Sequence, residues 1–159
     1  YWNKNLVGFA IGCSFTFEHD LLKNNLSIDH IKNNKIVPMY KTNICNLVSG
    51  VFSSNMVVSM RIFKKSDKKK IVDISKKFLF AHGEPIHIGD PNKIGIKNIL
   101  NPDWGDIPRK KNENENYYFW ACGVTPQNAV MHAKIPFCMS HTPGHMLITD
   151  KLEKDLLSL

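Results

Sequence analysis

The chain has 159 residues, 43% of them hydrophobic, which is enough to bury a core in one domain or slightly more. No apolar run reaches the roughly 18 residues that a membrane-spanning helix needs, so we expect no membrane partner. The formal net charge of +7 is nearly all lysine, and the lysines at 64–77 alternate with acidic and apolar residues, which argues against a nucleic-acid partner.

Two segments near the N-terminus are predicted to be helical. The apolar run 6–11 is compatible with the end of a helix, although it is too short to assign by its periodicity. Residues 15–24 follow with a helical pattern, and Ser14 or Thr16 is a suitable N-terminal cap. After these helices, residues 35–40 predict a strand whose proline places it at a sheet edge or at a strand end.

The middle of the chain predicts one strand and one helix. Residues 56–63 form the clearest strand, since they are rich in β-branched side chains and are bounded by polar residues. Residues 68–79 place apolar side chains at helical spacing beneath a lysine-rich face, as in an amphipathic helix. The stretch 81–105 is expected to be irregular, with a short helical turn after Pro91, and 110–116 to be a polar, disordered loop.

The last third of the chain predicts a strand followed by a helix. Residues 117–122 form the strand. Thr125 is a suitable N-cap, and the proline after it suits the first position of a helix over 127–134. Two further short strands are expected at 137–140 and 146–149. Strands and helices alternate without an internal repeat, so we expect an α/β or mixed α+β fold, with a mixed sheet flanked by helices.

The four cysteines are widely spaced and form no C-x-x-C pair: Cys13, Cys45, Cys122 and Cys138. This spacing favours reduced thiols over a disulfide framework or a structural zinc site, so we expect an intracellular protein of the cytoplasm or the mitochondrial matrix. The chain begins at Tyr1 without an initiator methionine and without the basic region of a signal peptide. We therefore expect it to be part of a longer protein.

Two ten-residue segments concentrate titratable side chains on predicted turns. Each contains two histidines followed by an aspartate, with glycine and proline between them. The first has His82, His87 and Asp90, and the second has His141, His145 and Asp150. Such groups on turns between apolar runs are typical of a site that a scaffold presents to a pocket. All six are candidate catalytic residues, because imidazole exchanges protons near neutral pH.

The sequence between the histidines argues against a helical metal motif. His141 and His145 are four residues apart, but the proline and glycine between them prevent the helix that such a motif requires. A proline lies between His82 and His87 as well. Loop-borne histidines and aspartates can still converge on a divalent cation, so a metal-dependent hydrolase is an alternative, although no cofactor is predicted.

The strand-to-helix turn 122–126 is a candidate binding element. The free backbone amides at a helix N-terminus can bind a carboxylate or an oxyanion, which makes Gly123 and Thr125 candidate substrate-binding residues. An ordinary strand-to-helix connection is an equal alternative. Cys122 is more simply explained as an inert buried thiol than as a nucleophile.

Three polar residues near strand ends are candidates for binding an acidic substrate: Arg61, Lys41 and Asn43. Arg61 lies at the end of the most apolar strand, so its guanidinium needs an anionic partner, either a ligand carboxylate or a structural Asp or Glu. Asp103 and Asp106 flank a tight turn, where they either bond to backbone or act as an acid and a base.

Seven segments, in order along the chain, together resemble one protein family. They are 12–18 (GCSFTFE), 37–43 (VPMYKTN), 57–61 (VVSMR), 82–91 (HGEPIHIGDP), 102–106 (PDWGD), 119–127 (FWACGVTPQ) and 141–150 (HTPGHMLITD). The family is that of the hydro-lyases that include D-glutamate cyclase, and the resemblance extends from about residue 3 to residue 150.

The resemblance implies a fold, an activity and an incomplete domain. Residues 1–150 would form a hydro-lyase-like domain that lacks its N-terminal part within a two-part α/β module, and residues 151–159 a tail or linker. The implied reaction is the elimination of water, with closure of D-glutamate to 5-oxo-D-proline as the named example. The implied partner is a small acidic substrate, and a homo-oligomer or fusion to further domains is compatible with this family.

Cyclisation requires a base near the amine, an acid near the departing oxygen, a cation for the α-carboxylate, and donors for an oxyanion. We assign His87 and His145 as acid and base, Asp90 and Asp150 as the groups that orient them, and Arg61 as the carboxylate clamp. A non-catalytic module that binds small acids or regulates another domain is the alternative, and it requires the clamp without the acid and base.

Overall fold

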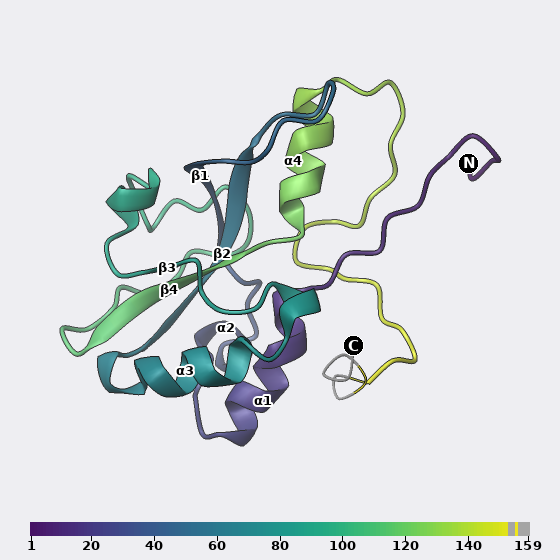
Figure 1. The fold of residues 1–159 in the computed structure, drawn as a ribbon. Helices are drawn as coiled ribbons and strands as arrows, with labels where there is room; N and C mark the ends of the chain where they lie inside the picture. Colours follow the sequence, from purple (N-terminus) through teal and green to yellow (C-terminus); the bar gives the residue numbers. More distant parts are fainter. Residues whose placement is uncertain (153–154, 156–159) are drawn as a thin grey trace.

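The protein is built around a four-stranded sheet (Figure 1), and the computed structural model describes residues 1–152 and 155. The strands lie in the order β1-β2-β4-β3. Their bounds are Met39–Cys45 for β1, Asn55–Lys64 for β2, His87–Ile88 for β3 and Glu115–Ala121 for β4. Every pairing between these strands is antiparallel, whereas a mixed sheet was expected.

Short helices surround the sheet, and they confirm the mixed α+β class. The α-helices are α1 (Glu18–Lys23), α2 (Asp29–Lys32), α3 (Lys68–Ser75) and α4 (Val124–His132). The 3-10 helices are η1 (Ser14–Phe17), η2 (Lys65–Asp67), η3 (Leu79–Ala81) and η4 (Pro91–Ile94). In Figure 1, α1, α2 and α3 lie together on one side of the sheet, and α4 lies beside the other end of β2. No helix in the described part of the chain is long and apolar enough to cross a membrane.

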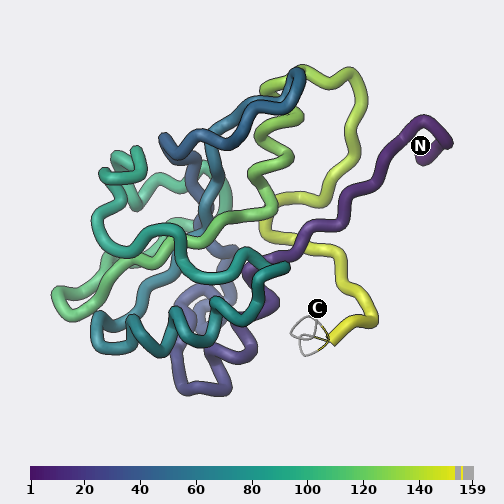
Figure 2. The backbone as a smooth tube through the Cα atoms, in the orientation of Figure 1, coloured from purple at the N-terminus to yellow at the C-terminus, as the bar shows by residue number. Residues whose placement is uncertain are grey.

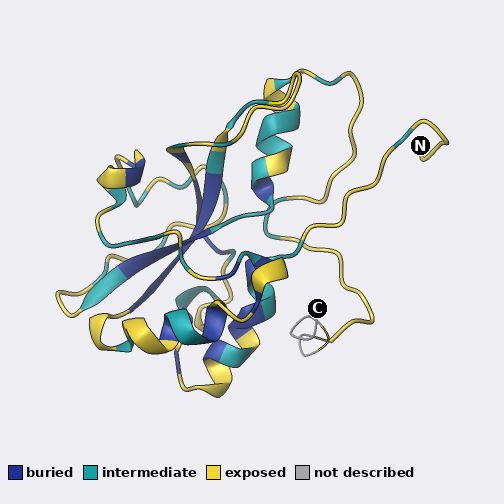
Figure 3. Ribbon diagram, viewed as in Figure 1, coloured by how far each residue is buried: buried dark blue, intermediate teal, exposed yellow. Residues whose placement is uncertain are grey.

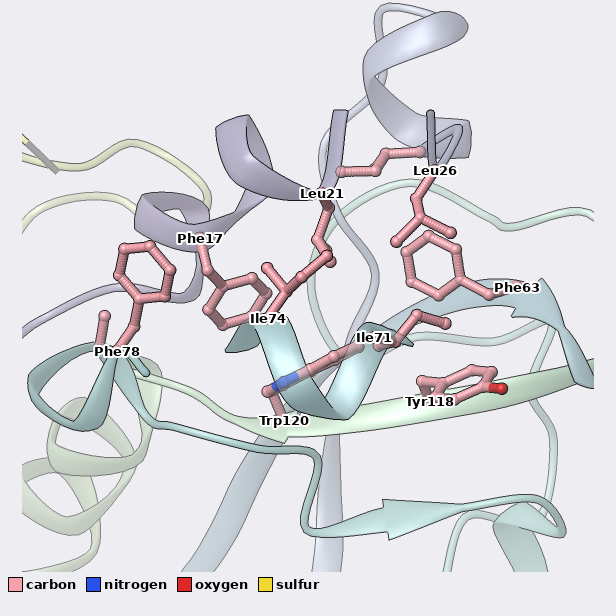
Figure 4. Packing of buried hydrophobic residues seen from close by; sticks show 11 residues of the cluster. Phe17, Leu21, Leu26, Phe63, Ile71, Ile74, Phe78, Tyr118 and Trp120 are labelled. Atoms are coloured by element: carbon pink, nitrogen blue, oxygen red, sulfur yellow. The ribbon is translucent and has the colours of Figure 1, made fainter. Parts of the chain in front are cut away.

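The two faces of the sheet bury different side chains, because successive residues of a strand point to opposite faces. The helix-side core lies between the sheet and α1 and α3 (Figure 4). It consists of Phe17, Leu21, Leu26, Ile28, Phe63, Ile71, Ile74, Phe78, Ala81, Tyr118 and Trp120. The loop-side core on the opposite face consists of Tyr40, Val58, Met60, Ile62, Ile94, Ile96, Tyr117 and Phe119. Figure 3 shows both central strands as buried over most of their length.

The strands predicted at 56–63 and 117–122 are confirmed as β2 and β4, and the helical turn after Pro91 is confirmed as η4. The predicted helix 68–79 is confirmed up to residue 75, where α3 ends.

Two other predictions for local structure need correction. The predicted helix 15–24 begins as η1, and neither Ser14 nor Thr16 caps it, because the Ser14 hydroxyl is drawn into the core and bonds Arg61 instead. The strand expected at 35–40 is β1, which begins only at residue 39, where the pairing with β2 starts at Met39 and Ser59.

The helix and strands predicted for the two terminal segments are wrong. Residues 6–11 are not helical, and 137–140 and 146–149 are not strands. Figure 2 shows the N-terminal stretch leading away from the sheet, and the C-terminal stretch turning back past α4 before it leads away as well. A strand needs a neighbour for its backbone groups. These segments pair with no other strand among the described residues, and apolar side chains such as Phe9 and Ile148 are 83% and 88% exposed. Residues 153–154 and 156–159 of the expected tail lie outside the described residues.

The loop 110–116, expected to be disordered, has a defined conformation. Its last two residues begin β4. Arg109 anchors it through Nη1, which lies 2.7 Å from Glu115 Oε2, and through Nε, which lies 2.6 Å from Asp29 Oδ2 in α2. This arginine holds the pKa of Glu115 at about 2 and links α2 to the start of β4.

Candidate functional site

A buried ion pair lies at the centre of the helix-covered face. Arg61, whose side chain is 1% exposed, extends from β2 toward the first turn of α1. Its Nε donates a hydrogen bond of 2.6 Å to Glu18 Oε1, and its Nη2 lies 2.5 Å from the same oxygen. Nη1 donates to the Ser59 hydroxyl and Nη2 to the Ser14 hydroxyl, each at 3.0 Å. All three guanidinium nitrogens are therefore satisfied by protein groups.

The surroundings of this pair strengthen it. The guanidinium carbon lies 5.2 Å from the ring centre of Trp120 and 5.5 Å from that of Phe17. Burial acts to raise the pKa of Glu18, but the charge of Arg61 and the hydrogen bond from His30 outweigh it and lower that pKa. Glu18 is therefore an ionised carboxylate inside an apolar layer, where an ion pair is little screened by water.

His30 completes the cluster from α2. Its Nε2 lies 3.1 Å from Glu18 Oε1 and 3.2 Å from Glu18 Oε2, and its ring stacks obliquely at 5.9 Å from Phe15. His30 is not among the site residues predicted from the sequence. Nothing in the sequence indicated the contact, because Glu18 and His30 are twelve residues apart and on different helices.

A cavity of about 250 Å³ opens beside this carboxylate and imidazole. It is lined by Phe15, Glu18, His30, Ile31, Asn34, Lys35, Ile36, Val37 and Gly144. Gly144 belongs to the second histidine segment and packs tightly on Ile36, since a Cβ there would be 2.4 Å from Ile36 Cγ2. The second segment thus reaches the cavity through its backbone.

Two thiols and a histidine lie close enough to Arg61 to feel its charge. The guanidinium acts electrostatically on Cys13, Cys122 and His82, so all three lie near it. Burial raises the pKa of the Cys13 thiol, and it raises the pKa of the Cys122 thiol to about 11. Both thiols are protonated at neutral pH, which agrees with the interpretation of Cys122 as inert.

His82 is held in an unusual position. Its backbone is left-handed, with φ of 78°, and its Nε2 is buried without a hydrogen-bond partner in the described part of the chain. Burial lowers the pKa of the His82 imidazole, so the neutral ring is favoured. A neutral imidazole with an open nitrogen is a group that can accept or donate a proton.

The depressed pKa of His82 predicts a pH dependence of stability. Below the ordinary value of 6.5, the unfolded chain binds a proton at this position that the folded chain resists. The free energy of unfolding should therefore fall as the pH decreases from 6.5 toward the folded-state pKa. Urea denaturation at about pH 7 and about pH 5.5 should show a smaller difference for His82→Gln than for the wild-type protein.

His19 provides the matched control for this measurement, since it is exposed on α1. His19→Gln should keep the wild-type difference between the two pH values. An equal loss of stability in His82→Gln and in the wild-type protein would contradict the role given to burial of His82.

His87 and Asp90 lie on the opposite face of the sheet from Arg61. His87 pairs with Phe119 across β3 and β4, and the two ring centres are 5.7 Å apart in the loop-side core region. Its Nε2 is 2.8 Å from the backbone oxygen of Asp90. Asp90 Oδ1 accepts from the backbone amide of Asn92 at 3.0 Å and caps η4, and this bond lowers the pKa of Asp90. The first histidine segment is thus divided between two faces.

The residues of the second histidine segment lie along the exposed C-terminal stretch. Gln127 Nε2 donates to the backbone oxygen of His141 at 3.2 Å, which fastens the segment to α4. His145 Nδ1 is 3.4 Å from the Pro143 oxygen, and Asp150 is exposed. The structure does not bring these side chains into the Arg61 cluster, and their catalytic roles stay predictions. Within residues 1–152 and 155, no group of three or more His, Cys, Asp or Glu is placed to hold a metal ion.

Lys41 and Asn43 occupy β1, where they serve the adjoining loop. The Lys41 amide donates to Asp103 Oδ2 at 2.8 Å, and its ammonium lies 5.3 Å from the Trp104 ring centre. Asp106 Oδ2 accepts from a backbone amide at 2.7 Å as well. Asp103 and Asp106 thus bond to backbone, the simpler of their two interpretations. Asn43 packs against Gly95, where an added Cβ would be 3.0 Å away.

The residue that caps α4 differs from the predicted one. Gly123 is the N-cap, and Thr125 is not, because its hydroxyl accepts from the Val57 amide at 3.0 Å and donates to the Val57 oxygen at 3.2 Å. Thr125 therefore fastens α4 to β2. A Cβ on Gly123 would be 4.0 Å from the Gly12 oxygen, so this turn adjoins the segment that precedes Cys13.

Comparisons with known proteins point to one family. A family model described as D-glutamate cyclase matches residues 7–150. The chain is 50% identical over 159 residues to a protein of Pelagibacter ubique. That alignment covers 100% of this chain and 61% of the relative. It is also 48% identical over 153 residues to a protein of Oceanobacillus iheyensis. That alignment covers 96% of this chain and 61% of the relative. Both relatives are provisionally named hydro-lyases, and the chain spans about three fifths of their length.

Proposed function

Because the chain belongs to the D-glutamate cyclase family, we propose that the protein of which it forms part is a hydro-lyase acting on a small amino acid, with D-glutamate as the substrate and 5-oxo-D-proline as the product. One observation supports this site above others. Four segments that resemble the family meet at the Arg61–Glu18 pair: 12–18, 57–61, 82–91 and 119–127.

The reaction defines what the site must supply. The α-ammonium of D-glutamate loses a proton, and the nitrogen then attacks the carbon of the γ-carboxyl group. A carbon–oxygen bond of that group breaks, and the oxygen departs as water with the two protons that the nitrogen has lost. Proton transfer and stabilisation of negative charge on the γ-carboxyl oxygens are the two requirements.

The helix-covered face has groups suited to both requirements. His82 is neutral and has an open ring nitrogen, and the Ser14 and Ser59 hydroxyls lie within 3.0 Å of the guanidinium. The Arg61 side chain is 1% exposed and is paired with Glu18, so it offers little surface to a substrate carboxylate. We therefore assign Arg61 mainly as the group that keeps Glu18 ionised, and the direct clamp stays a prediction.

A non-catalytic small-acid-binding module is the second candidate. The observation in its favour is that both thiols are protonated and that the guanidinium is buried and paired with Glu18, which would also suit a rigid binding site. Such a module would bind the ligand without transferring a proton.

Proton NMR of the full-length protein separates the two candidates. The protein is incubated with D-glutamate, L-glutamate or 5-oxo-D-proline, each with and without a chelator. We expect 5-oxo-D-proline signals to appear from the D-enantiomer alone. Line broadening of one ligand without any turnover would overturn the cyclase proposal in favour of a binding module, and inhibition by the chelator would show a need for metal.

A further inference from the structure

His30 has the geometry of a proton-transfer group. Its Nε2 faces both oxygens of Glu18 at 3.1 and 3.2 Å. A carboxylate only accepts hydrogen bonds, so the proton in this contact is assigned to His30 Nε2. The Nδ1 atom then has a free lone pair, and it is neither bonded nor sealed off within the described residues.

Glu18 is fixed in the position that orients this ring. Arg61 bonds it from one side and His30 from the other, and the Glu18 side chain is 7% exposed. The order cation, carboxylate, imidazole is that of a general base held by an ionised partner. Glu18 is thus a positioning residue, which sets the tautomer and the orientation of the His30 ring.

The cavity beside His30 suits a small anion. Its volume of about 250 Å³ lies just below the range of roughly 300–1,000 Å³ for drug-sized ligands. Glu18 is neutralised by Arg61, which leaves Lys35 as the uncompensated charge on the lining. The Lys35 ammonium uses one proton on the Ile107 oxygen at 3.3 Å and has two more to offer a carboxylate.

On the basis of the function proposed above, we infer that His30 is the catalytic acid and base of the reaction and that this cavity holds the α-amino acid. His30 Nδ1 takes a proton from the α-ammonium, and the nitrogen forms its bond to the γ-carboxyl carbon. The imidazolium returns that proton to the γ-carboxyl oxygen as the carbon–oxygen bond breaks. The second proton from the nitrogen goes to the same oxygen, and water leaves.

The test replaces His30 by glutamine in the full-length protein. A glutamine amide can still donate to Glu18, so the Arg61–Glu18 pair and the fold are retained. We expect kcat for D-glutamate to fall at least about a hundredfold, the usual scale for loss of an acid–base group, with little change in KM. His19→Gln, on the exposed side of α1, is the matched control and should keep wild-type kcat.

Glu18→Gln tests the positioning role. The amide keeps the size of the side chain but removes the charge next to His30. We expect kcat to fall with little change in KM. A purely structural role would lower the free energy of unfolding but leave kcat of the folded protein unchanged.

NMR signals of the His30 ring, assigned by comparison with His30→Gln, give a readout that does not need turnover. Titration with D-glutamate should shift these signals in the wild-type protein. Turnover in the wild type together with unchanged kcat in His30→Gln would overturn the inference and leave the hydro-lyase proposal intact. Absence of turnover in the wild type would overturn the catalytic role together with the function, and a shift of the His30 signals would then show that the cavity binds the acid.

Discussion

Glu18→Ala is expected to lower the free energy of unfolding by about 3–5 kcal/mol, the range for removal of one partner from a buried ion pair. The Arg61 side chain is 1% exposed and bonds the Glu18 carboxylate through Nε and Nη2. Without that carboxylate, its charge would remain among aromatic rings with hydroxyl groups as its only partners. Urea denaturation of the full-length protein, followed by tryptophan fluorescence, measures the difference.

An exposed ion pair supplies the control for this experiment. Asp73 and Lys76 also form an ion pair, but their side chains are 44% and 54% exposed. Asp73→Ala should change the free energy of unfolding far less than Glu18→Ala does, because solvent screens the exposed pair. The double variant Glu18→Leu with Arg61→Met should recover part of the loss, because it leaves no charge unpaired. Equal losses for Glu18→Ala and Asp73→Ala would disprove the burial argument.

The contribution of the Arg61–Glu18 pair to stability depends on pH. The folded-state pKa of Glu18 is lowered from its ordinary value of 4.5. Its contribution to stability is therefore complete above about pH 4.5 and is lost as the pH falls through the folded-state pKa. Denaturation experiments near neutral pH report the whole effect.

Gly12→Ala is expected to destabilise the protein by about 3 kcal/mol or more, at the upper end of the range for overpacking. A Cβ at this position would be 1.7 Å from the Phe80 oxygen and 2.7 Å from the Phe80 carbonyl carbon. Both atoms belong to the backbone of η3, so no side-chain rotation relieves the overlap. The displacement would extend to His82, two residues later. Urea denaturation and the NMR signals of the His82 ring measure the two consequences.

Gly8→Ala is the control for Gly12→Ala. Its Cβ would be 3.2 Å from Cη2 of Trp2, which is the end of a flexible, exposed side chain. The free energy of unfolding should change by about 0.5 kcal/mol or less, as for most surface substitutions. If the two alanine variants had the same stability, the close approach of residue 12 to η3 would be refuted.

The elements predicted correctly are those whose own residues determine them. β2 and β4 are runs of β-branched and aromatic residues that no helix accommodates well, and the apolar spacing of α3 requires one buried stripe. The strands expected near residues 137–149 had a similar composition. They failed because a strand also needs a neighbour, and the sequence does not say whether one is present.

The candidate site was only partly predictable for a related reason. The sequence required an anion for Arg61 but could not choose between a ligand and Glu18, which is 43 residues away. It grouped His82 with His87, although the chain crosses from one face of the sheet to the other between them. His30 had no local signal at all, because its role depends on the packing of α2 against α1.

The shortness of α2 has a consequence for how the site responds to heat. A helix of four residues has too few internal hydrogen bonds to persist alone, so α2 depends on the contact of Asp29 with Arg109 and of His30 with Glu18. Local opening of such a segment requires less free energy than unfolding of the sheet. As the temperature rises, the imidazole should leave the carboxylate while β2 and β4 are still paired. Thermal inactivation would then precede the melting of the protein, and the backbone amides of α2 would exchange with solvent before those of the central strands.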